Sequence, residues 1–387
     1  MKKGSAVYDN IRLMLPGPTP VPPSVLQAQA LPMINHRGKE FSQLLSEAVE
    51  GVKWVYQTKG DVLLLTSSGT GGLESAIVNV LSPGDPVLAL VTGEFGERFA
   101  KIAETFGASV DRLKSETGKA IETDEVKKQL TQKKYKALLI THNETSTAVM
   151  NPIEEIAKAA KERGILVLVD GITSVGVVDL PVDEWGLDIV VSGSQKGFMM
   201  PPGLAFVSVS PDAWKAHQEA KMPRFYWDYS RFLLFADKGQ TPWTPAISTV
   251  YALHRAVELL REEGLENIFA RHELLTKMVR AGVRAMGLKL LVEEDRIASR
   301  AVTAVFPPDG ISPHQLRAKV QEKFGIVLAG GQGGLKDSIF RIGHIGNYRP
   351  ADILIALAAL EVVLREMGYE AHGGVEAAQN LMSPVPA

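Results

Sequence analysis

The chain has 387 residues, of which 45% are apolar and 22% are charged, and its formal net charge is -2. This composition is typical of a globular protein, and the near-neutral charge offers no basic surface for nucleic acid or an anionic membrane. The absence of cysteine excludes disulfides, iron–sulfur clusters, thiolate metal sites and a cysteine nucleophile. Because no apolar run is long enough for a membrane span or a signal peptide, we expect a cytoplasmic protein.

The N-terminal segment is rich in proline. Residues 11–23, IRLMLPGPTPVPP, hold five prolines, which forbid a helix and favour an extended chain. We expect an ordered arm at 1–20 that lies over the body of the protein, because Ile11 and Leu13 would otherwise be exposed. A disordered leader is the alternative. A helical pattern of apolar residues follows over 41–56.

A loop rich in hydroxyl groups and glycine follows the first expected strand. The strand is at 62–65, the loop TSSGTGG at 66–72 and a helix at 73–81. Such a loop can hold a phosphate, because free backbone N–H groups, the helix dipole and Ser or Thr donors converge there. An ordinary strand–turn–helix is the alternative. A nucleotide-binding enzyme is a weaker one, since no Lys-Ser or Lys-Thr pair closes the loop.

The middle of the chain alternates between strands and helices. Strands separated by helices of this length predict a mainly parallel sheet with right-handed crossovers. The strands are expected at 87–91, 137–141, 165–169, 188–191 and 204–209, and the helices at 98–106 and 153–163.

Asp170 and Lys196 follow two of these strands. The carboxyl ends of neighbouring parallel strands meet at one edge of a sheet, where open α/β proteins build ligand sites. Small residues and a glutamine precede Lys196 in SGSQKG, so we expect a partly desolvated ammonium group rather than a solvated loop lysine. A desolvated lysine is a nucleophile that can form a Schiff base. An aspartate opposite it suits pyridoxal phosphate (PLP), whose ring nitrogen must stay protonated to accept electrons.

The second half of the chain is less regular. Residues 222–245 are crowded with aromatic residues and proline, which indicates either core packing or a substrate wall or subunit contact. A helix at 247–263 precedes a smaller α+β unit, so we expect a large domain at 21–265 and a small C-terminal domain at 266–387. The later strands are expected at 301–306 and 339–342, and the later helices at 313–324 and 351–367.

Arg341 lies inside the last of these strands. An arginine in an apolar strand needs a partner, and a carboxylate, which can accept two of its hydrogen bonds, suits it. That carboxylate belongs either to a substrate or to a structural salt bridge. His142 and His344 lie near strand ends but have no partner at metal-ligand spacing, so we expect no metal site.

Three motifs resemble the class V aminotransferases, which have the PLP-dependent transferase fold type I. They are SGSQKG with Lys196, VDGITSVG with Asp170, and SSGTGGLE after a strand, and the similarity extends from LPGPTPVPP to FRIGHIG. The chain looks most like the alanine–glyoxylate and serine–glyoxylate (serine–pyruvate) branch. The resemblance implies an α/β fold with a mainly parallel seven-stranded sheet in the large domain, a smaller C-terminal α+β domain, and pyridoxal 5'-phosphate as cofactor.

The resemblance also implies roles for individual residues. Lys196 would form the Schiff base and Asp170 would bind the pyridinium nitrogen. Phe95, where many relatives carry tryptophan, would stack on the ring, and Arg341 would bind the substrate α-carboxylate. The other matches are Ser68, Gly69, Thr70 and Gln195 for the phosphate, Thr145 for the ring hydroxyl, Ile172 for the opposite ring face, and Thr241 (often tyrosine in relatives) and Thr244 for the phosphate of a neighbouring subunit.

These matches predict a transaminase that moves an amino group from alanine or serine to glyoxylate or pyruvate, working as a homodimer with composite sites. One arginine for one carboxylate favours small monocarboxylic substrates. The alternatives are another class V enzyme, such as a lyase, and an accessory or non-catalytic subunit, because some relatives carry the name of a soluble-hydrogenase small subunit. A cysteine desulfurase is excluded, since that reaction needs a catalytic cysteine.

Overall fold

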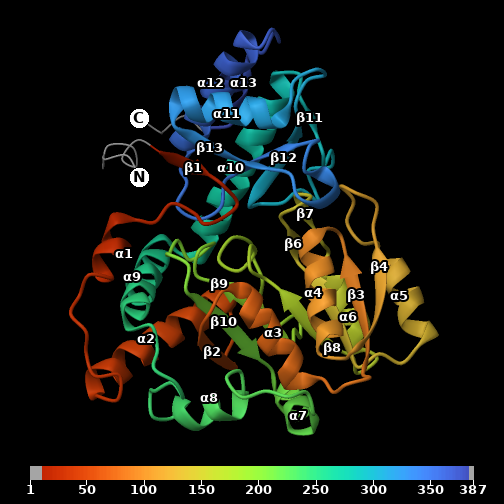
Figure 1. The fold of residues 1–387 in the computed structure, drawn as a ribbon, viewed down its shortest axis with the longest axis vertical. Helices are drawn as coiled ribbons and strands as arrows, with labels where there is room; N and C mark the ends of the chain where they lie inside the picture. Colours follow the sequence, from red (N-terminus) through yellow and green to blue (C-terminus); the bar gives the residue numbers. More distant parts are fainter. Residues whose placement is uncertain (1–10, 383–387) are drawn as a thin grey trace.

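A seven-stranded sheet forms the centre of the larger part of the structure (Figure 1). The structure is a computed structural model that describes residues 11–382. Strand β10 runs antiparallel to its two neighbours, and all other adjacent pairs are parallel. In sheet order the strands are β2 (Asp61–Thr66), β10 (Leu204–Val209), β9 (Ile189–Gly193), β8 (Leu166–Asp170), β5 (Ala137–Thr141), β3 (Pro86–Val91) and β4 (Ser109–Lys114).

Helices cover both faces of this sheet, which explains why most of its strands are apolar throughout. Successive residues of a strand point to opposite faces. Val190 packs in the core formed with α2, α6 and α9, whereas Val191 packs in the core formed with α3, α4 and α7. The helices around this sheet are α2 (Lys39–Tyr56), α3 (Gly69–Val80), α4 (Glu94–Thr105), α5 (Thr123–Gln132), α6 (Ile153–Lys161), α7 (Pro211–Glu219) and α9 (Ile247–Glu263).

A five-stranded sheet forms the smaller part, at the top of Figure 1, and packs on the C-terminal helices through an apolar cluster of its own. Its edge strand β1 (Arg12–Met14) comes from the N-terminal segment and pairs in parallel with β13. In sheet order the strands are β1, β13 (Ile326–Gly330), β14 (Phe340–Gly343), β12 (Val302–Phe306) and β11 (Lys289–Leu290). The helices are α10 (Leu265–Ala285), α11 (Pro313–Phe324), α12 (Pro350–Glu366) and α13 (Gly374–Gln379).

The short elements that remain lie in connections. They are α1 (Pro23–Ala28), the hairpin of β6 (Asn143–Glu144) and β7 (Val149–Met150), α8 (Tyr229–Ala236) and the 3₁₀ turn η2 (Gly333–Leu335). Within residues 11–382, no helix combines the length and the apolar character needed to cross a membrane.

Most expected strands and helices are confirmed, but α3 and α4 each begin four residues earlier than predicted. Helix α3 begins at Gly69 rather than Leu73, so the hydroxyl-rich loop supplies its first turn. Helix α4 begins at Glu94 rather than Arg98, which places Phe95 on a helix instead of in a turn. Glycine in both first turns lowers helix propensity and hides these starts from sequence reasoning. The sequence also gave no indication of β4, β13 or the 21-residue helix α10.

The N-terminal arm belongs to both parts of the structure. Its strand β1 extends the small sheet, and residues after it reach the larger part, so a disordered leader is wrong for residues 11–20. Residues 1–10 of the expected arm lie outside the described residues. The domain limits at 20 and 265 stay predictions.

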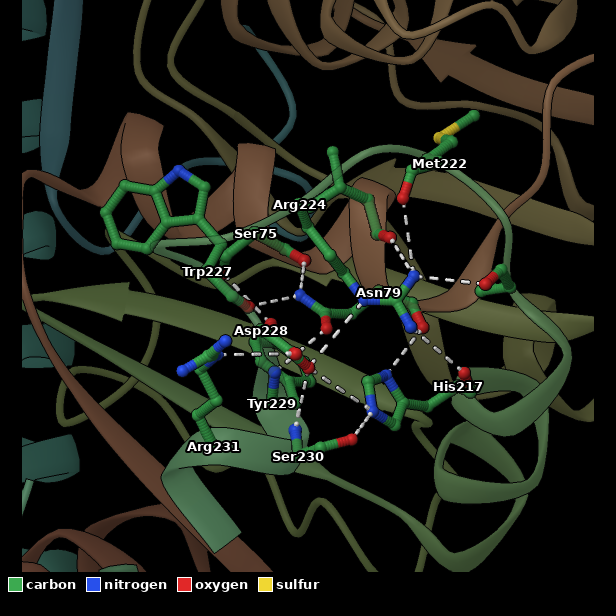
Figure 2. Close-up of polar contacts among 12 residues, drawn as sticks. Ser75, Asn79, His217, Met222, Arg224, Trp227, Asp228, Tyr229, Ser230 and Arg231 are labelled. Atoms are coloured by element: carbon green, nitrogen blue, oxygen red, sulfur yellow. Dashed lines mark hydrogen bonds and ion pairs between the residues drawn. The ribbon is translucent and has the colours of Figure 1, made fainter. Parts of the chain in front are cut away.

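A buried polar network fixes the aromatic segment 222–231 against α3 (Figure 2). Asn79, which is fully buried on α3, lies at its centre. Its Nδ2 donates to Trp227 O at 2.6 Å, and its Oδ1 accepts from Tyr229 N at 3.0 Å. Trp227 Nε1 in turn donates to Glu74 Oε1 on the same helix at 3.1 Å. The inner side of this aromatic segment is therefore part of the core and anchors α3.

His217 and Arg224 extend the network (Figure 2). His217 Nδ1 lies 3.1 Å from Asn79 O, and its Nε2 lies 2.6 Å from Ser230 Oγ. Burial lowers the pKa of His217, and the positive charge of Arg224 lowers it further, so the ring is neutral at pH 7. Arg224 donates to the backbone carbonyls of Val78, His217, Ala220 and Met222.

We expect Asn79→Ala to destabilise the protein by about 2 to 4 kcal/mol, because it leaves a buried N–H and a buried carbonyl without partners. Chemical denaturation followed by tryptophan fluorescence measures this loss. Asn267→Ala is the matched control, since Asn267 is exposed at the start of α10 and its side chain donates to Glu263 O, at the end of α9. Equal losses for both variants would contradict a central role for Asn79.

Candidate active site

A cavity of about 180 Å³ lies at the carboxyl edge of the seven-stranded sheet. Its walls come from the segments that follow β2, β3, β5, β8 and β9, five strands that run in the same direction. Nine of the twelve predicted site residues line it. The lining residues are Ser68, Gly69, Thr70, Leu73, Phe95, Arg98, Asn143, Thr145, Asp170, Ile172, Thr173, Gln195 and Lys196.

Lys196 lies in this cavity with its amine against the N-terminal arm. Its Nζ donates to Pro16 O at 2.8 Å. Burial lowers the pKa of Lys196 to about 8; Asp170 opposes this change, and Arg341 and Arg98 add to it. A free amine is therefore available at a pH about two units lower than for an ordinary lysine.

Asp170 is the buried carboxylate of the cavity. Its Oδ1 accepts from Ile172 N at 3.0 Å. Burial raises the pKa of Asp170 to about 7; the negative charge of Glu144 raises it further, whereas the Ile172 hydrogen bond and the charge of Lys196 lower it. A cation that enters the cavity would lower the pKa of this carboxyl group, because a nearby positive charge favours its ionised form.

The N-terminus of α3 opens into the same cavity. Ser68 is the N-cap residue, but its side chain does not cap the helix, and both it and Thr70 line the cavity. A Cβ at Gly69 would lie 2.6 Å from Ile172 Cδ1, so the backbone approaches the cavity wall without room for a side chain. Among residues 11–382, Gln195 Oε1 is buried without a hydrogen-bond partner. An uncapped helix N-terminus beside hydroxyl donors is suited to an anion such as a phosphate.

Phe95 and Thr145 reach the cavity from α4 and from the β6–β7 hairpin. A residue that the sequence analysis missed, Glu144, holds these two elements together. Its Oε2 accepts from Phe95 N and Gly96 N at 3.0 Å each, and its Oε1 accepts from Ser146 N at 3.0 Å. Burial raises the pKa of Glu144, and these hydrogen bonds lower it. The sequence did contain a signal for Glu144: it is a carboxylate in the segment HNETSTA, which follows the buried strand β5.

Arg341 lies next to the cavity rather than in its wall. Its Nη1 donates to Thr145 O at 2.6 Å and to Gln332 Oε1 at 3.2 Å, and its Nε donates to Gly330 O at 2.8 Å. Burial lowers the pKa of Arg341 to about 10. No carboxylate of the described residues forms a salt bridge with it, so the alternative of a structural salt bridge is wrong for residues 11–382. Its charge is available to an incoming anion.

Thr241 and Thr244 do not reach this cavity within one chain. Thr241 is buried, and its Oγ1 donates to Trp243 O at 2.7 Å. Thr244 is exposed. Both were predicted to contact the phosphate of a neighbouring subunit, so their role stays a prediction.

Arg98 is a second cavity residue that the sequence analysis missed. It is exposed, and its Cζ lies 4.7 Å from the centroid of the Phe95 ring, which places a cation on one face of that ring. Asn143 and Thr173 were also missed; Asn143 Nδ2 donates to Thr173 Oγ1 at 2.8 Å across the cavity wall. Arg98 and Asn143 lie three residues from Phe95 and two from Thr145, so proximity in sequence was the only signal.

The fold and the cavity define the class of protein. A mainly parallel seven-stranded sheet with a smaller α+β part is the architecture of the PLP-dependent transferases of fold type I, as predicted. The family described as Aminotransferase class-V matches residues 13–349. The chain belongs to this family and is an aminotransferase.

Individual relatives cover almost the whole chain. A protein of Synechococcus sp. (strain PCC 6716) named soluble hydrogenase, small subunit, is 46% identical over 97% of this chain and 100% of its own length. The L-aspartate–glyoxylate aminotransferase of Paracoccus denitrificans (strain Pd 1222) is 38% identical over 95% of each chain. The crystal structure of an alanine–glyoxylate aminotransferase from Nostoc sp. has a TM-score of 0.89 at 30% identity, and covers 94% of this chain and 97% of that chain.

We expect Lys196 of the cofactor-free chain to become reactive toward an amine reagent as the pH rises through about 8. Below that pH the amine is protonated and does not react; above it the free amine does. Mass spectrometry of the Lys196 peptide after brief labelling at a series of pH values measures the midpoint. In the urea-unfolded chain the midpoint should return to the ordinary lysine value of about 10.4. Identical midpoints in the folded and unfolded chains would show that the cavity does not alter this amine.

Proposed function

We propose that this aminotransferase uses pyridoxal phosphate bound in the described cavity, and that it transfers an amino group from a small amino acid, alanine or serine, to glyoxylate or pyruvate. One observation carries the proposal: Lys196, Asp170 and the uncapped N-terminus of α3 line a single cavity. An amine, a carboxylate and an anion cradle match the aldehyde, the ring nitrogen and the phosphate of this cofactor. When bound, pyridoxal phosphate supplies an aldehyde that bonds reversibly to amines and a protonated ring that accepts electrons.

Lys196 is the proposed proton carrier. Once its amine is free it can take a proton from the amino acid Cα and deliver it to C4′ of the cofactor, the transfer that transamination requires. Its lowered pKa matches this task, because a base works best with a pKa near the operating pH. Asp170 holds the ring nitrogen in its protonated form, since the ion pair favours both charges inside a desolvated cavity.

Ser68, Gly69, Thr70 and Gln195 are proposed to hold the phosphate, and Phe95 and Ile172 to enclose the ring. Glu144 supports this arrangement, because it fixes the backbone of Phe95 to the hairpin that carries Thr145. Arg341 is proposed to bind the substrate carboxylate, which every amino acid and 2-oxo acid provides. The three carbonyl oxygens that hold Arg341 fix its direction, so little side-chain entropy is lost on binding.

The names of two relatives support the choice of acceptor. Both the Paracoccus denitrificans protein and the Nostoc protein are named for glyoxylate, whereas their donors differ, aspartate in one and alanine in the other. The Synechococcus relative is named as a hydrogenase subunit. Because the present chain has no cysteine, a role beside a hydrogenase could only be accessory.

Lys196→Ala should lose the borohydride-reducible adduct with pyridoxal phosphate and nearly all turnover, because both the bonding amine and the proton carrier are gone. Turnover of alanine with glyoxylate and the mass of the reduced peptide measure the two effects. Lys119→Ala, at an exposed lysine that pairs with Glu294, is the control and should behave as wild type. Unchanged turnover in Lys196→Ala would overturn the proposed function.

Arg341→Leu should weaken substrate use, measured as kcat/KM, by roughly a hundredfold or more, because a desolvated charged pair contributes a few kcal/mol. The absorbance spectrum of the bound cofactor should stay as in wild type. Arg296→Leu, at an exposed arginine, serves as the control. In a panel of donors, alanine or serine should exceed aspartate and glutamate. If aspartate is the best donor, the small-substrate proposal is wrong although the aminotransferase assignment stands.

We also propose a homodimer, with Thr241 and Thr244 facing the partner's phosphate. Phe225, which stacks on Trp243 next to Thr244 in sequence, and Leu234 on α8 are each 65% exposed, and large exposed apolar side chains are typical of interaction sites. Phe225 and Tyr226 stack on Trp243, so the aromatic side chains form one group on this surface. Sedimentation should give the mass of two chains; a fully active monomer would contradict this proposal.

A further inference from the structure

The N-terminal arm contacts the Lys196 amine directly. Pro16 O accepts the hydrogen bond from Lys196 Nζ at 2.8 Å. The next residue, Gly17, has a φ of +133°, and a Cβ there would overlap Nζ and lie 2.6 Å from Cδ and 2.7 Å from Cε of the lysine. The arm therefore supplies a hydrogen-bond acceptor for the amine. Because Gly17 has no side chain, the Lys196 side chain can lie directly against the arm.

The arm is held in this place by the small sheet. Arg12 Nη1 pairs with Asp352 Oδ1 at 2.7 Å, and β1 pairs with β13. The buried hydroxyl of Tyr348 donates to Leu13 O at 2.6 Å and accepts from Leu15 N at 3.2 Å. These contacts position the chain directly before Pro16.

Beyond Gly17 the arm joins the loop that carries the lysine. Thr19 N donates to Gln195 O at 3.3 Å, and Thr19 Oγ1 donates to Lys196 O at 3.4 Å. The residues from Pro16 to Thr19 thus contact both the backbone and the amine of Lys196. This gives the amine a fixed position relative to the small sheet as well as to the large one.

We propose that Pro16 and Gly17 form a seat that holds the Lys196 amine whenever it is not bonded to the cofactor aldehyde. The inference rests on the proposed function. A carbonyl oxygen can only accept, so it engages an N–H of the amine and leaves the nitrogen lone pair pointing elsewhere. A seated amine has fewer rotamers to search, and a fixed reactive group gains rate from orientation. Pro16, Gly17 and Tyr348 are positioning residues, because they act by fixing the place of the Lys196 amine.

The test compares two glycines with positive φ in the full-length chain. Gly17→Ala places a Cβ on the lysine side chain. Gly310→Ala also puts an alanine at a positive φ, +82°, but with no atom within 4 Å of the added Cβ. Each cofactor-free variant receives pyridoxal phosphate, and borohydride stops the reaction at set times. Mass spectrometry of the Lys196 peptide gives the rate at which the amine bonds to the aldehyde, with loss of water.

Gly17→Ala should bond to the cofactor at least tenfold more slowly than wild type, and Gly310→Ala within twofold of it. In steady state Gly17→Ala should lose kcat while the KM for the amino acid stays near wild type, because Arg341 is untouched. If the substitution only destabilised the fold, the melting temperature would fall, and the selective loss of kcat at an unchanged KM would not be seen. Wild-type rates and kcat in a folded Gly17→Ala variant would overturn the seat.

Tyr348→Phe keeps the inference testable if Gly17→Ala does not fold. It removes the hydroxyl that binds Leu13 O and Leu15 N, and it should slow bonding about threefold or more; Tyr369→Phe, at a half-buried tyrosine, is the control. Equal rates in Tyr348→Phe and wild type would overturn the seat. If wild type itself forms no reducible bond at Lys196, the proposed function fails, and the two failures are thereby distinguished.

Discussion

The candidate site depends on the parallel pairing of β8 with β9. In this pairing Asp170 is level with Val191, so the chain needs only a few more residues to carry Lys196 to the same edge of the sheet. Both strands are buried on both faces, and a shift of one residue would turn every apolar side chain to the wrong core. Packing of the two cores therefore fixes the register, and the register sets the level at which the carboxylate and the lysine enter the cavity.

Burial gives these groups their chemistry. The same desolvation that lowers the pKa of Lys196 to about 8 raises that of Asp170 to about 7, so both titrate near neutral pH. Glu144 adds a second buried carboxylate, and Arg341 adds a second buried cation with no salt-bridge partner among residues 11–382. These charged groups are already oriented before a ligand enters. They can therefore stabilise the complementary charges of a ligand more strongly than water, whose molecules must first reorient.

The site draws on both parts of the fold. The large sheet supplies the lysine, the aspartate and the helix N-terminus, whereas the small sheet supplies Arg341 and, through β1, the carbonyl of Pro16. Arg341 donates to Thr145 O, and Pro16 accepts from Lys196, so each of these hydrogen bonds joins the smaller part of the structure to the larger part. A displacement of the small sheet would move Arg341 and the carbonyl that binds the Lys196 amine together.

The sequence by itself determined the α/β class and the centre of the cavity, because those features depend on local patterns: apolar runs predict buried parallel strands, and residues just after them must meet at one edge. Asp170, Lys196 and the glycine-rich turn are such residues. The family resemblance added Thr145, Ile172 and Gln195. Only the tertiary structure decided that Glu144 binds the first turn of α4, that Arg98 lies over Phe95, and that Pro16 holds the Lys196 amine. Pro16 and Lys196 are 180 positions apart, and no periodicity connects them; the arm reaches the lysine because β1 pairs with β13 near the other end of the chain.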